Sequence, residues 1–293
     1  MSDSYEFIDG LRYAYPIVKM CGWLGVSRSG FYEWRGRPAS ATTERREALK
    51  AKIATIFADE DETYGYRRIH AELGRQGVVA GPELVRALMR ELGLVACQPR
   101  PWRHSLTVQG QAGNIVDLLE RDFSAAVPGA KLVGDITYID TWEGWLFLAT
   151  VIDCHTKKVI GYAMGDNYKT PLISLAIERA AANMALPDGA IFHSDRGSNY
   201  TSHEYGEKLE SLDILQSVGR TGICFDNAMA ESFFGVLKTE LVHRTQYPTR
   251  AHARRDIARY IEFRYNTRRI HSGLGYCTPQ EVHDAYMHDQ DAA

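Results

Sequence analysis

A change of sequence pattern at Lys131 constrains the fold of this chain more than any other feature. From there, three runs rich in β-branched and aromatic residues, over 132–139, 145–153 and 158–164, follow one another with only short turn segments between them. This spacing predicts an antiparallel meander of three strands. The pattern then predicts a helix over 171–185, a strand over 190–194, a helix over 202–212, a strand over 214–218 and a helix that begins near Asn227.

A meander followed by alternating helices and strands is the element order of an α/β sheet covered by helices. We therefore expect a ribonuclease H-like core, in which a mixed five-stranded sheet carries flanking helices. The helical patterns that precede Lys131 predict small all-α helix-turn-helix modules in front of this core.

The segment from Ile17 to Trp34 shows the pattern of two short helices around a turn. Apolar residues recur at helical spacing, Gly25 breaks the first helix, and Ser27 can cap the second. In a helix-turn-helix the second helix enters the major groove of DNA, so Ser27 and Arg28 would face DNA. A helical hairpin without a DNA role is the alternative, because short helix pairs are common.

A second helical unit is predicted from Tyr64 to Leu94, after a polar helix over 43–59. Its apolar residues recur at helical spacing, and Pro82 stands at the first position of its second helix. Arg67 and Arg68 belong to a group of arginines that leaves the unit with a net positive charge. We therefore expect a second nucleic-acid-binding module here.

The net charge of −3 conceals an uneven distribution along the chain. Acidic residues gather in the middle third, whereas the segment from Lys238 to Arg269 is rich in arginine. This pattern fits a protein that binds phosphates at its edges and divalent cations in its middle, although solvated helix faces would also produce it. No apolar run reaches the ~18 residues that span a membrane, and the five cysteines form no paired motif. We expect a cytoplasmic protein with reduced thiols and no membrane partner.

Three carboxylates lie far apart in the sequence but at related places in the predicted sheet. Asp135 lies on the first strand, Asp195 directly after the fourth, and Glu231 in the first turns of the helix after the fifth. Ligands of α/β sheets gather at the carboxyl ends of strands. Mg²⁺ prefers oxygen ligands, and two such ions about 3.5–4 Å apart can activate an attacking oxygen and stabilise a leaving one. The three carboxylates supply the ligands for such a site.

The helix that carries Glu231 also carries Lys238, seven residues further along. At about 100° per residue, Lys238 lies within ~20° of the same helix face. Gly235 lies between them and leaves that face open to close approach. A face with a carboxylate, a gap and a cation predicts a surface that binds a DNA strand.

Other acidic residues near these motifs are weaker candidates for metal ligands. Asp140, Asp153 and Asp166 are interpreted as turn or strand-end residues, and Asp226 as a helix cap. His193 has no second nitrogen or sulfur ligand at metal spacing, so zinc is not expected.

The motifs together resemble the bacterial insertion-sequence transposases of the retroviral-integrase (DDE) type, specifically the product of their second reading frame. The resemblance covers nearly the whole chain, and its motifs occur in order. They are L-G-V-S-R-S-G-F-Y-E-W, Y-G-Y-R-R-I-H, G-D-I-T-Y-I, H-S-D-R-G-S-N-Y-T-S, D-N-A-M-A-E-S-F-F-G-V-L-K-T-E and Y-N-T-R-R-I-H.

This resemblance implies that Asp135, Asp195 and Glu231 form the acidic triad. Asp135 and Asp195 would bridge two Mg²⁺ ions, which Mn²⁺ can replace, and Glu231 would hold one of them. Lys238 would contact the terminal DNA of the element. Further DNA contacts are expected from Arg196, Asn199, Arg268 and Arg269; Asn199 stands where many relatives have glutamine.

Five consecutive parts follow from the patterns and the resemblance. They are a helix-turn-helix with its connecting helix (1–60), a second helical DNA-binding module (61–95), a linker (96–125), an integrase-type catalytic core (126–240) and a basic helical extension (241–293).

The activity that the resemblance implies is cleavage at insertion-sequence ends, followed by transfer of the 3′-hydroxyl strand through phosphodiester transesterification. The partners would be double-stranded DNA of the ends and the target, further copies of the chain, and an upstream-frame product that is separate or joined by frameshifting. A nucleoid-associated location in a bacterial cytoplasm would follow. A ribonuclease H-like nuclease and a catalytically silent, sequence-specific DNA-binding regulator are the alternatives.

Overall fold

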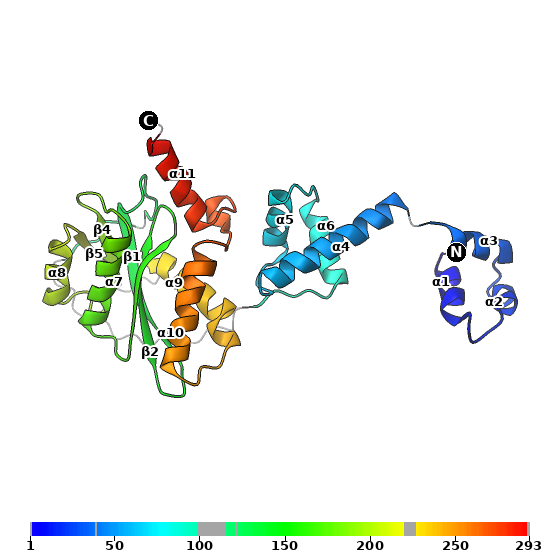
Figure 1. Cartoon of the computed structure of the whole chain (residues 1–293), viewed down its shortest axis with the longest axis horizontal. Coiled ribbons are helices and arrows are strands. Elements are labelled where there is room, and N and C mark those ends of the chain that lie inside the picture. Colours follow the sequence, from blue (N-terminus) through cyan, green and yellow to red (C-terminus); the bar gives the residue numbers. More distant parts are fainter. Residues whose placement is uncertain (1, 39, 99–114, 121, 220–226, 292–293) are drawn as a thin grey trace.

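The computed structural model describes residues 2–38, 40–98, 115–120, 122–219 and 227–291. Three short helices form the first part of the chain (Figure 1). They are α1 (Ser2–Leu11), α2 (Ile17–Trp23) and α3 (Arg28–Gly36), and they enclose a small core that includes Ile8, Met20 and Phe31. The side chain of Ser27 accepts a hydrogen bond from the Gly30 amide at 3.3 Å, which confirms the predicted cap of α3. The sequence pattern did not predict α1.

The second helical module consists of α4 (Ala41–Asp59), α5 (Tyr66–Arg75) and α6 (Pro82–Glu91). The boundary that the sequence predicts at residue 60 places α4 in the first module. In the structure, Leu49 and Ile53 of α4 instead pack in one buried cluster with Ile69 of α5 and Leu88 of α6. The long helix α4 lies beside α5 and α6 in Figure 1. It therefore belongs to the second module, because burial of its apolar side depends on that contact.

A mixed sheet of five strands forms the centre of the larger part, as predicted. The strands are β1 (Lys131–Ile139), β2 (Leu146–Asp153), β3 (Val159–Gly165), β4 (Ile191–Ser194) and β5 (Leu215–Val218). Their order across the sheet is β3-β2-β1-β4-β5. The first three pair in antiparallel fashion, whereas β4 pairs with β1 and β5 in parallel. The first strand therefore lies between the meander and the parallel half of the sheet.

Helices cover both faces of this sheet. The apolar side chains of α7 (Thr170–Asn183) and α8 (His203–Glu210) pack in one buried cluster with residues of the sheet. A second cluster joins other residues of the sheet to α9 (Ala228–Glu240) and α10 (Arg250–Arg259). Figure 1 shows α7 and α9 on opposite sides of the strands. This two-sided cover is the layered α/β architecture that the sequence predicts.

The C-terminal segment continues the core. It contains a short 3₁₀ turn η2 (Val242–Arg244), α10, a π-helical turn η3 (Tyr260–Tyr265), a second 3₁₀ turn η4 (Ser272–Leu274) and α11 (Pro279–Asp291). Ile257, Ile261 and Tyr265 are buried in the same cluster as β1 and β2. The boundary that the sequence predicts at residue 241 therefore cuts through a single hydrophobic core.

The predicted linker over 96–125 lies largely outside the described residues. In its described part, Leu119 is buried against the sheet, and the Leu118 amide donates to the Ser217 hydroxyl at 2.9 Å. This end of the segment is thus packed on the core. Across the residues that the structure describes, no helix is both long and apolar enough to cross a membrane.

Candidate active site

Asp135 lies in the middle of β1 and follows a glycine that the packing requires. A Cβ atom on Gly134 would lie only 2.2 Å from the ring of Phe192 on β4. One oxygen of Asp135 accepts a hydrogen bond from the Ile136 amide at 2.7 Å. The motif around Asp135 therefore combines a close strand contact with a carboxylate held by the amide of the next residue.

Asp195 directly follows β4, the parallel neighbour of β1. Val133 of β1 is paired with His193 of β4, so Asp135 and Asp195 each lie two residues beyond one register pair. Adjacent strands are about 4.8 Å apart, and side chains alternate between the faces of a sheet. The parallel pairing thus brings the two carboxylates to neighbouring places, as the sequence predicts. One oxygen of Asp195 accepts a hydrogen bond from the Gly197 amide at 2.9 Å.

Glu231 lies in the first turn of α9, as predicted. The start of α9 is tied to β1 by Asn227, whose side-chain amide donates to the carbonyl oxygen of Gly134 at 3.2 Å. Asn227 is 7% exposed. It connects the helix that carries Glu231 to the strand that carries Asp135. Asn227 lies inside the third acidic motif, but nothing in the sequence indicates this role.

The three carboxylates share one electrostatic environment. Burial raises the pKa of Asp135 to about 8, and the negative charges of Asp195 and Glu231 add to this effect, while the Ile136 amide and Lys238 oppose it. Burial also raises the pKa of Asp195, and burial together with Asp195 raises that of Glu231. Like charges that are close together and partly buried favour either protonation or a bound cation.

The donor chemistry of this triad fits a divalent cation, since carboxylate oxygens are the ligands that Mg²⁺ prefers. As positioned, however, no three His, Cys, Asp or Glu side chains among the described residues are close enough to hold one metal ion together. Asp135 and Asp195 each have one oxygen bonded to a backbone amide.

Lys238 lies on α9 beside the carboxylates, as predicted. Its ammonium nitrogen is 5.1 Å from the ring centre of Tyr138, a residue of β1. Burial lowers the pKa of Lys238, and the charge of Asp135 opposes this effect. An added Cβ on Gly235 would meet no other heavy atom within 4 Å among the described residues. The α9 surface between Glu231 and Lys238 is therefore open to a close-approaching chain.

The remaining candidates next to Asp195 have mainly local contacts. The Arg196 side chain donates through Nε to the carbonyl oxygen of Gly219 at 2.6 Å, which connects the loop after β4 with the end of β5. Asn199 is half-buried, and its backbone carbonyl accepts a hydrogen bond from the Ser202 hydroxyl at 2.7 Å. Both residues lie within four residues of Asp195 in the sequence, and their contact with DNA stays a prediction.

Among the predicted DNA-binding residues of the helical modules, some side chains are exposed and one is paired within the protein. Ser27, Arg28 and Arg67 are exposed. Arg68 is only half-buried, but it forms an ion pair with Glu240 at 3.3 Å. These positions agree with a DNA contact for the first three residues and give Arg68 a contact inside the protein.

The two arginines after η3 are also engaged within the protein. Arg268 forms an ion pair with Glu60 at 3.2 Å. Arg269 is 3% exposed, and its guanidinium binds Glu240 at 3.0 Å. The expected DNA contact is therefore wrong for Arg269, because a buried guanidinium with a carboxylate partner does not reach a phosphate.

The weaker metal candidates are turn residues where the structure describes them. Asp153 is fully buried and accepts hydrogen bonds from the Gly129 amide at 2.9 Å and from the Thr156 amide and hydroxyl at 2.8 and 2.6 Å. It closes the turn after β2, as its position in the sequence indicates. Asp226 lies outside the described residues.

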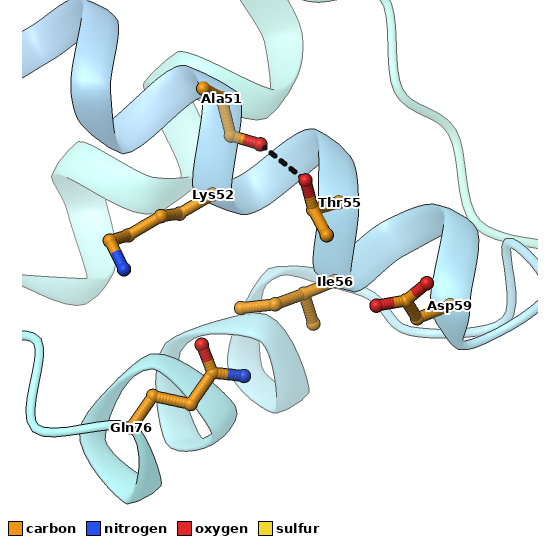
Figure 2. A pocket seen from close by; sticks show the side chains of 6 residues that line it. All are labelled: Ala51, Lys52, Thr55, Ile56, Asp59 and Gln76. Carbon is orange, nitrogen blue, oxygen red and sulfur yellow. Dashed lines mark hydrogen bonds between the residues drawn. The ribbon is translucent and has the colours of Figure 1, made fainter.

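A pocket in the second module lies apart from the triad. Figure 2 shows its lining, which comes from α4 and the end of α5. Lys52, Asp59 and Gln76 are its charged and amide side chains, and Thr55 donates a hydrogen bond to the Ala51 carbonyl at 3.1 Å. None of these residues belongs to the predicted site.

Comparison with protein families gives three matches along the chain. Two models described as "Integrase core domain" match residues 125–224 and 212–279, and one described as "HTH-like domain" matches residues 44–102. The last match begins within α4, in agreement with the packing of that helix on α5 and α6.

Two similar curated proteins cover almost the whole chain. The "Insertion element IS600 uncharacterized 31 kDa protein" of Shigella sonnei is 36% identical over 267 residues, which are 91% of this chain and 98% of that protein. "Transposase InsF for insertion sequence IS3A" of Escherichia coli (strain K12) is 35% identical over 285 residues, which are 94% of this chain and 97% of that protein.

Solved structures with some similarity include a simian T-cell lymphotropic virus intasome in complex with a PP2A regulatory subunit, at 16% identity and a TM-score of 0.47. That match covers 79% of this chain and 74% of the other. The HTLV-2 integrase catalytic core domain in complex with magnesium matches at 16% identity with a TM-score of 0.42, over 54% of this chain and 98% of the other.

Proposed function

Because the chain belongs to the insertion-sequence transposases and contains an integrase core, we propose that it cuts DNA at the ends of its element and transfers the freed strand with Asp135, Asp195 and Glu231. The first step would break a phosphodiester bond by hydrolysis and leave a 3′-hydroxyl. In the second, this hydroxyl would attack another phosphodiester bond and displace its 3′ oxygen. One carboxylate triad serves both steps, because both are displacements at phosphorus.

The observation that carries this proposal is the shared environment of the three carboxylates. They come from a strand, a strand end and a helix, and each has its pKa raised by burial. Asp135, Asp195 and Glu231 would hold two magnesium ions, and manganese would be able to replace magnesium. When bound, such ions lower the pKa of the attacking group and stabilise charge on the attacking and leaving oxygens.

The other residues would bind and orient DNA. Lys238 would contact a phosphate of the strand that lies along α9, where Gly235 leaves room for the backbone. Arg196 and Asn199 would support the same strand from the loop after β4. Additional phosphate or base contacts would come from the exposed residues of the modules, which are Ser27, Arg28 and Arg67.

Joining of two DNA ends needs more than one active site. We infer that the chain acts as a homo-oligomer on double-stranded DNA. An upstream-frame product, either fused by frameshifting or bound as a separate chain, would supply further end recognition.

The test is Mg²⁺-dependent joining of oligonucleotides that carry the element's ends. Asp195→Asn and Glu231→Gln preserve side-chain size and should reduce joining by at least about 10²-fold, since each removes a negative charge that would hold the metal ions. Asp166→Asn is the matched control, because Asp166 lies in an exposed turn and its carboxylate contacts Asn167.

Full joining by either triad variant would refute the site assignment. Cleavage of RNA–DNA hybrids without any joining would instead identify a hydrolase. DNA binding without metal-dependent cleavage would identify a silent regulator.

A further inference from the structure

A buried carboxylate at the end of α9 gathers side chains from distant parts of the chain. Glu240 is 8% exposed and accepts hydrogen bonds from Arg269 Nε at 3.0 and 3.1 Å. The Tyr260 hydroxyl donates to it at 2.8 Å, and the Arg68 guanidinium at 3.3 Å. We call Arg68, Glu240, Tyr260 and Arg269 the Glu240 cluster.

The Glu240 cluster is an ionised network. Burial alone would raise the pKa of Glu240, but Arg269, Tyr260 and Arg68 together hold it below its ordinary value. Removal of one partner from a buried ion pair leaves an uncompensated charge and is costly, whereas an intact pair fixes a specific geometry. The cluster is therefore suited to define an orientation.

The cluster connects two modules. Glu240 belongs to the helix that carries Glu231 and Lys238, whereas Arg68 belongs to α5 of the HTH-like module. Glu240 lies nine residues after Glu231, or ~13.5 Å along the helix axis. A shift of the module relative to the core would therefore move α9 close to Glu231 and Lys238, which this helix carries.

Further contacts strengthen the same junction. The Tyr64 hydroxyl accepts a hydrogen bond from the Ile270 amide at 3.0 Å, and Ile270 is buried in the hydrophobic cluster of the module. Arg264 and Arg268 both pair with Glu60 at 3.2 Å. The second module and the C-terminal segment thus form a continuous polar and apolar interface around the Glu240 cluster.

We propose that the Glu240 cluster is a positioning device that sets the HTH-like module against α9, so that DNA bound by the module meets Glu231 and Lys238 in fixed register. Arg68 and Arg269, which the sequence marks as DNA contacts, act in this device through Glu240. The proposal rests on the proposed function, since the register concerns the phosphodiester bond that is cut. It makes Arg68 and Glu240 positioning residues, which do not touch the substrate.

The test compares the full-length chain with Arg68→Met, Glu240→Gln and Arg68→Lys. In Arg68→Met we expect end-DNA affinity within about threefold of the unmodified protein, and a fall in kcat by about 10²-fold, the effect of a misplacement of roughly 1 Å. The cut should also spread from one phosphodiester bond to its neighbours, as mapped on a sequencing gel. Glu240→Gln should show the same spread, and Arg68→Lys should recover part of the fidelity.

Two substitutions serve as comparisons. Arg46→Met removes an ion pair with Glu91 that stays inside the module, and it should leave kcat and the cut position unchanged. Arg67→Met alters an exposed neighbour of Arg68 and should raise KM for DNA without moving the cut.

A readout without catalysis separates this proposal from the proposed function. Hydrogen exchange of the Ile270 amide reports the bond to Tyr64 and should become faster in Arg68→Met, but not in Arg46→Met. Unchanged exchange in Arg68→Met would overturn the proposal even if the protein joins no DNA. Faster exchange with an unmoved cut and an unchanged kcat would overturn it as well, because the contact would then be only structural.

Discussion

Replacement of Gly134 by alanine tests the packing that places Asp135. The added Cβ would lie 2.2 and 2.6 Å from two atoms of the Phe192 ring and 3.2 Å from the Thr150 carbonyl oxygen. Ordinary contact begins at 3.4 Å, so the ring or the strand must move by more than an ångström. Phe192 is 1% exposed and packs against Tyr200 and Tyr205, with ring centres 5.9 and 5.6 Å away, so it has little room to move.

The expected cost follows from this overlap. Overpacking of a close-packed core costs about 1–3 kcal/mol, and the clash with both a ring and a strand carbonyl favours the upper end, ~3 kcal/mol. For a domain of this size, about 1 kcal/mol lowers Tm by roughly 2–4 °C, so a decrease of about 6–12 °C is expected. Because Asp135 is the next residue, joining should decrease more than the loss of folded protein explains.

A double-mutant cycle with Phe192→Leu provides the assay, with unfolding free energies from urea denaturation and joining rates at a temperature where all variants are folded. Leucine removes the clashing ring edge, so the double variant should be more stable than the sum of the two single changes, by a coupling of about 0.5–3 kcal/mol. An unchanged unfolding free energy in Gly134→Ala would refute the packing. Additive effects in the cycle would show that Phe192 is not the clashing group.

Three further predictions concern the Asn227 contact that holds α9 to β1, the loss of stability at low pH, and the metal requirement of joining. Asn227→Ala should lower the unfolding free energy by about 1–3 kcal/mol and slow joining, because it leaves the buried Gly134 carbonyl without the Asn227 donor. Urea denaturation measures this loss, and Asn167→Ala, in an exposed loop, is the control. Burial and the charge of Arg269 lower the pKa of His271 to about 3, so the unfolded chain binds a proton first as pH falls below 6.5. Stability should therefore decrease from pH 6.5 toward 3, and His271→Gln should flatten this decrease in a Tm series; an unaltered slope would contradict it. Chelation of divalent cations should abolish joining, while binding of end DNA in a gel-shift assay persists. Addition of Mg²⁺ or Mn²⁺ should restore joining. Full joining in excess chelator would exclude a metal-dependent site.

The sheet and the positions of Asp135, Asp195 and Glu231 on its elements could be predicted because local patterns determine the strands and helices. The strand runs are rich in β-branched and aromatic residues and end in turns, and the structure moves their bounds by at most one residue: β2, for example, begins at Leu146, where the sequence predicts 145. The order of the elements then places Asp195 and Glu231 at one edge of the sheet. The positions of the three carboxylates in the fold could thus be predicted, while their role in catalysis stays a prediction.

Tertiary contacts set the limits of this prediction. The sequence predicts only a polar helix over 43–59, and nothing local indicates that α4 packs on α5 and α6 and not on α3. In the same way, Arg67 and Arg68 are adjacent and chemically identical, and only the fold turns Arg68 toward Glu240. A run of arginines predicts positive charge, not exposure, because the partner of each guanidinium lies far away in the sequence.

The central claim is that Asp135, Asp195 and Glu231 hold the metal ions that act on DNA. Anomalous diffraction from crystals of the chain with end DNA and Mn²⁺ would test it most directly. We predict two manganese peaks, both within about 2.2 Å of carboxylate oxygens, with Asp135 and Asp195 between them and Glu231 on one. Manganese peaks elsewhere, or their absence from this site in a complex that joins DNA, would contradict the account.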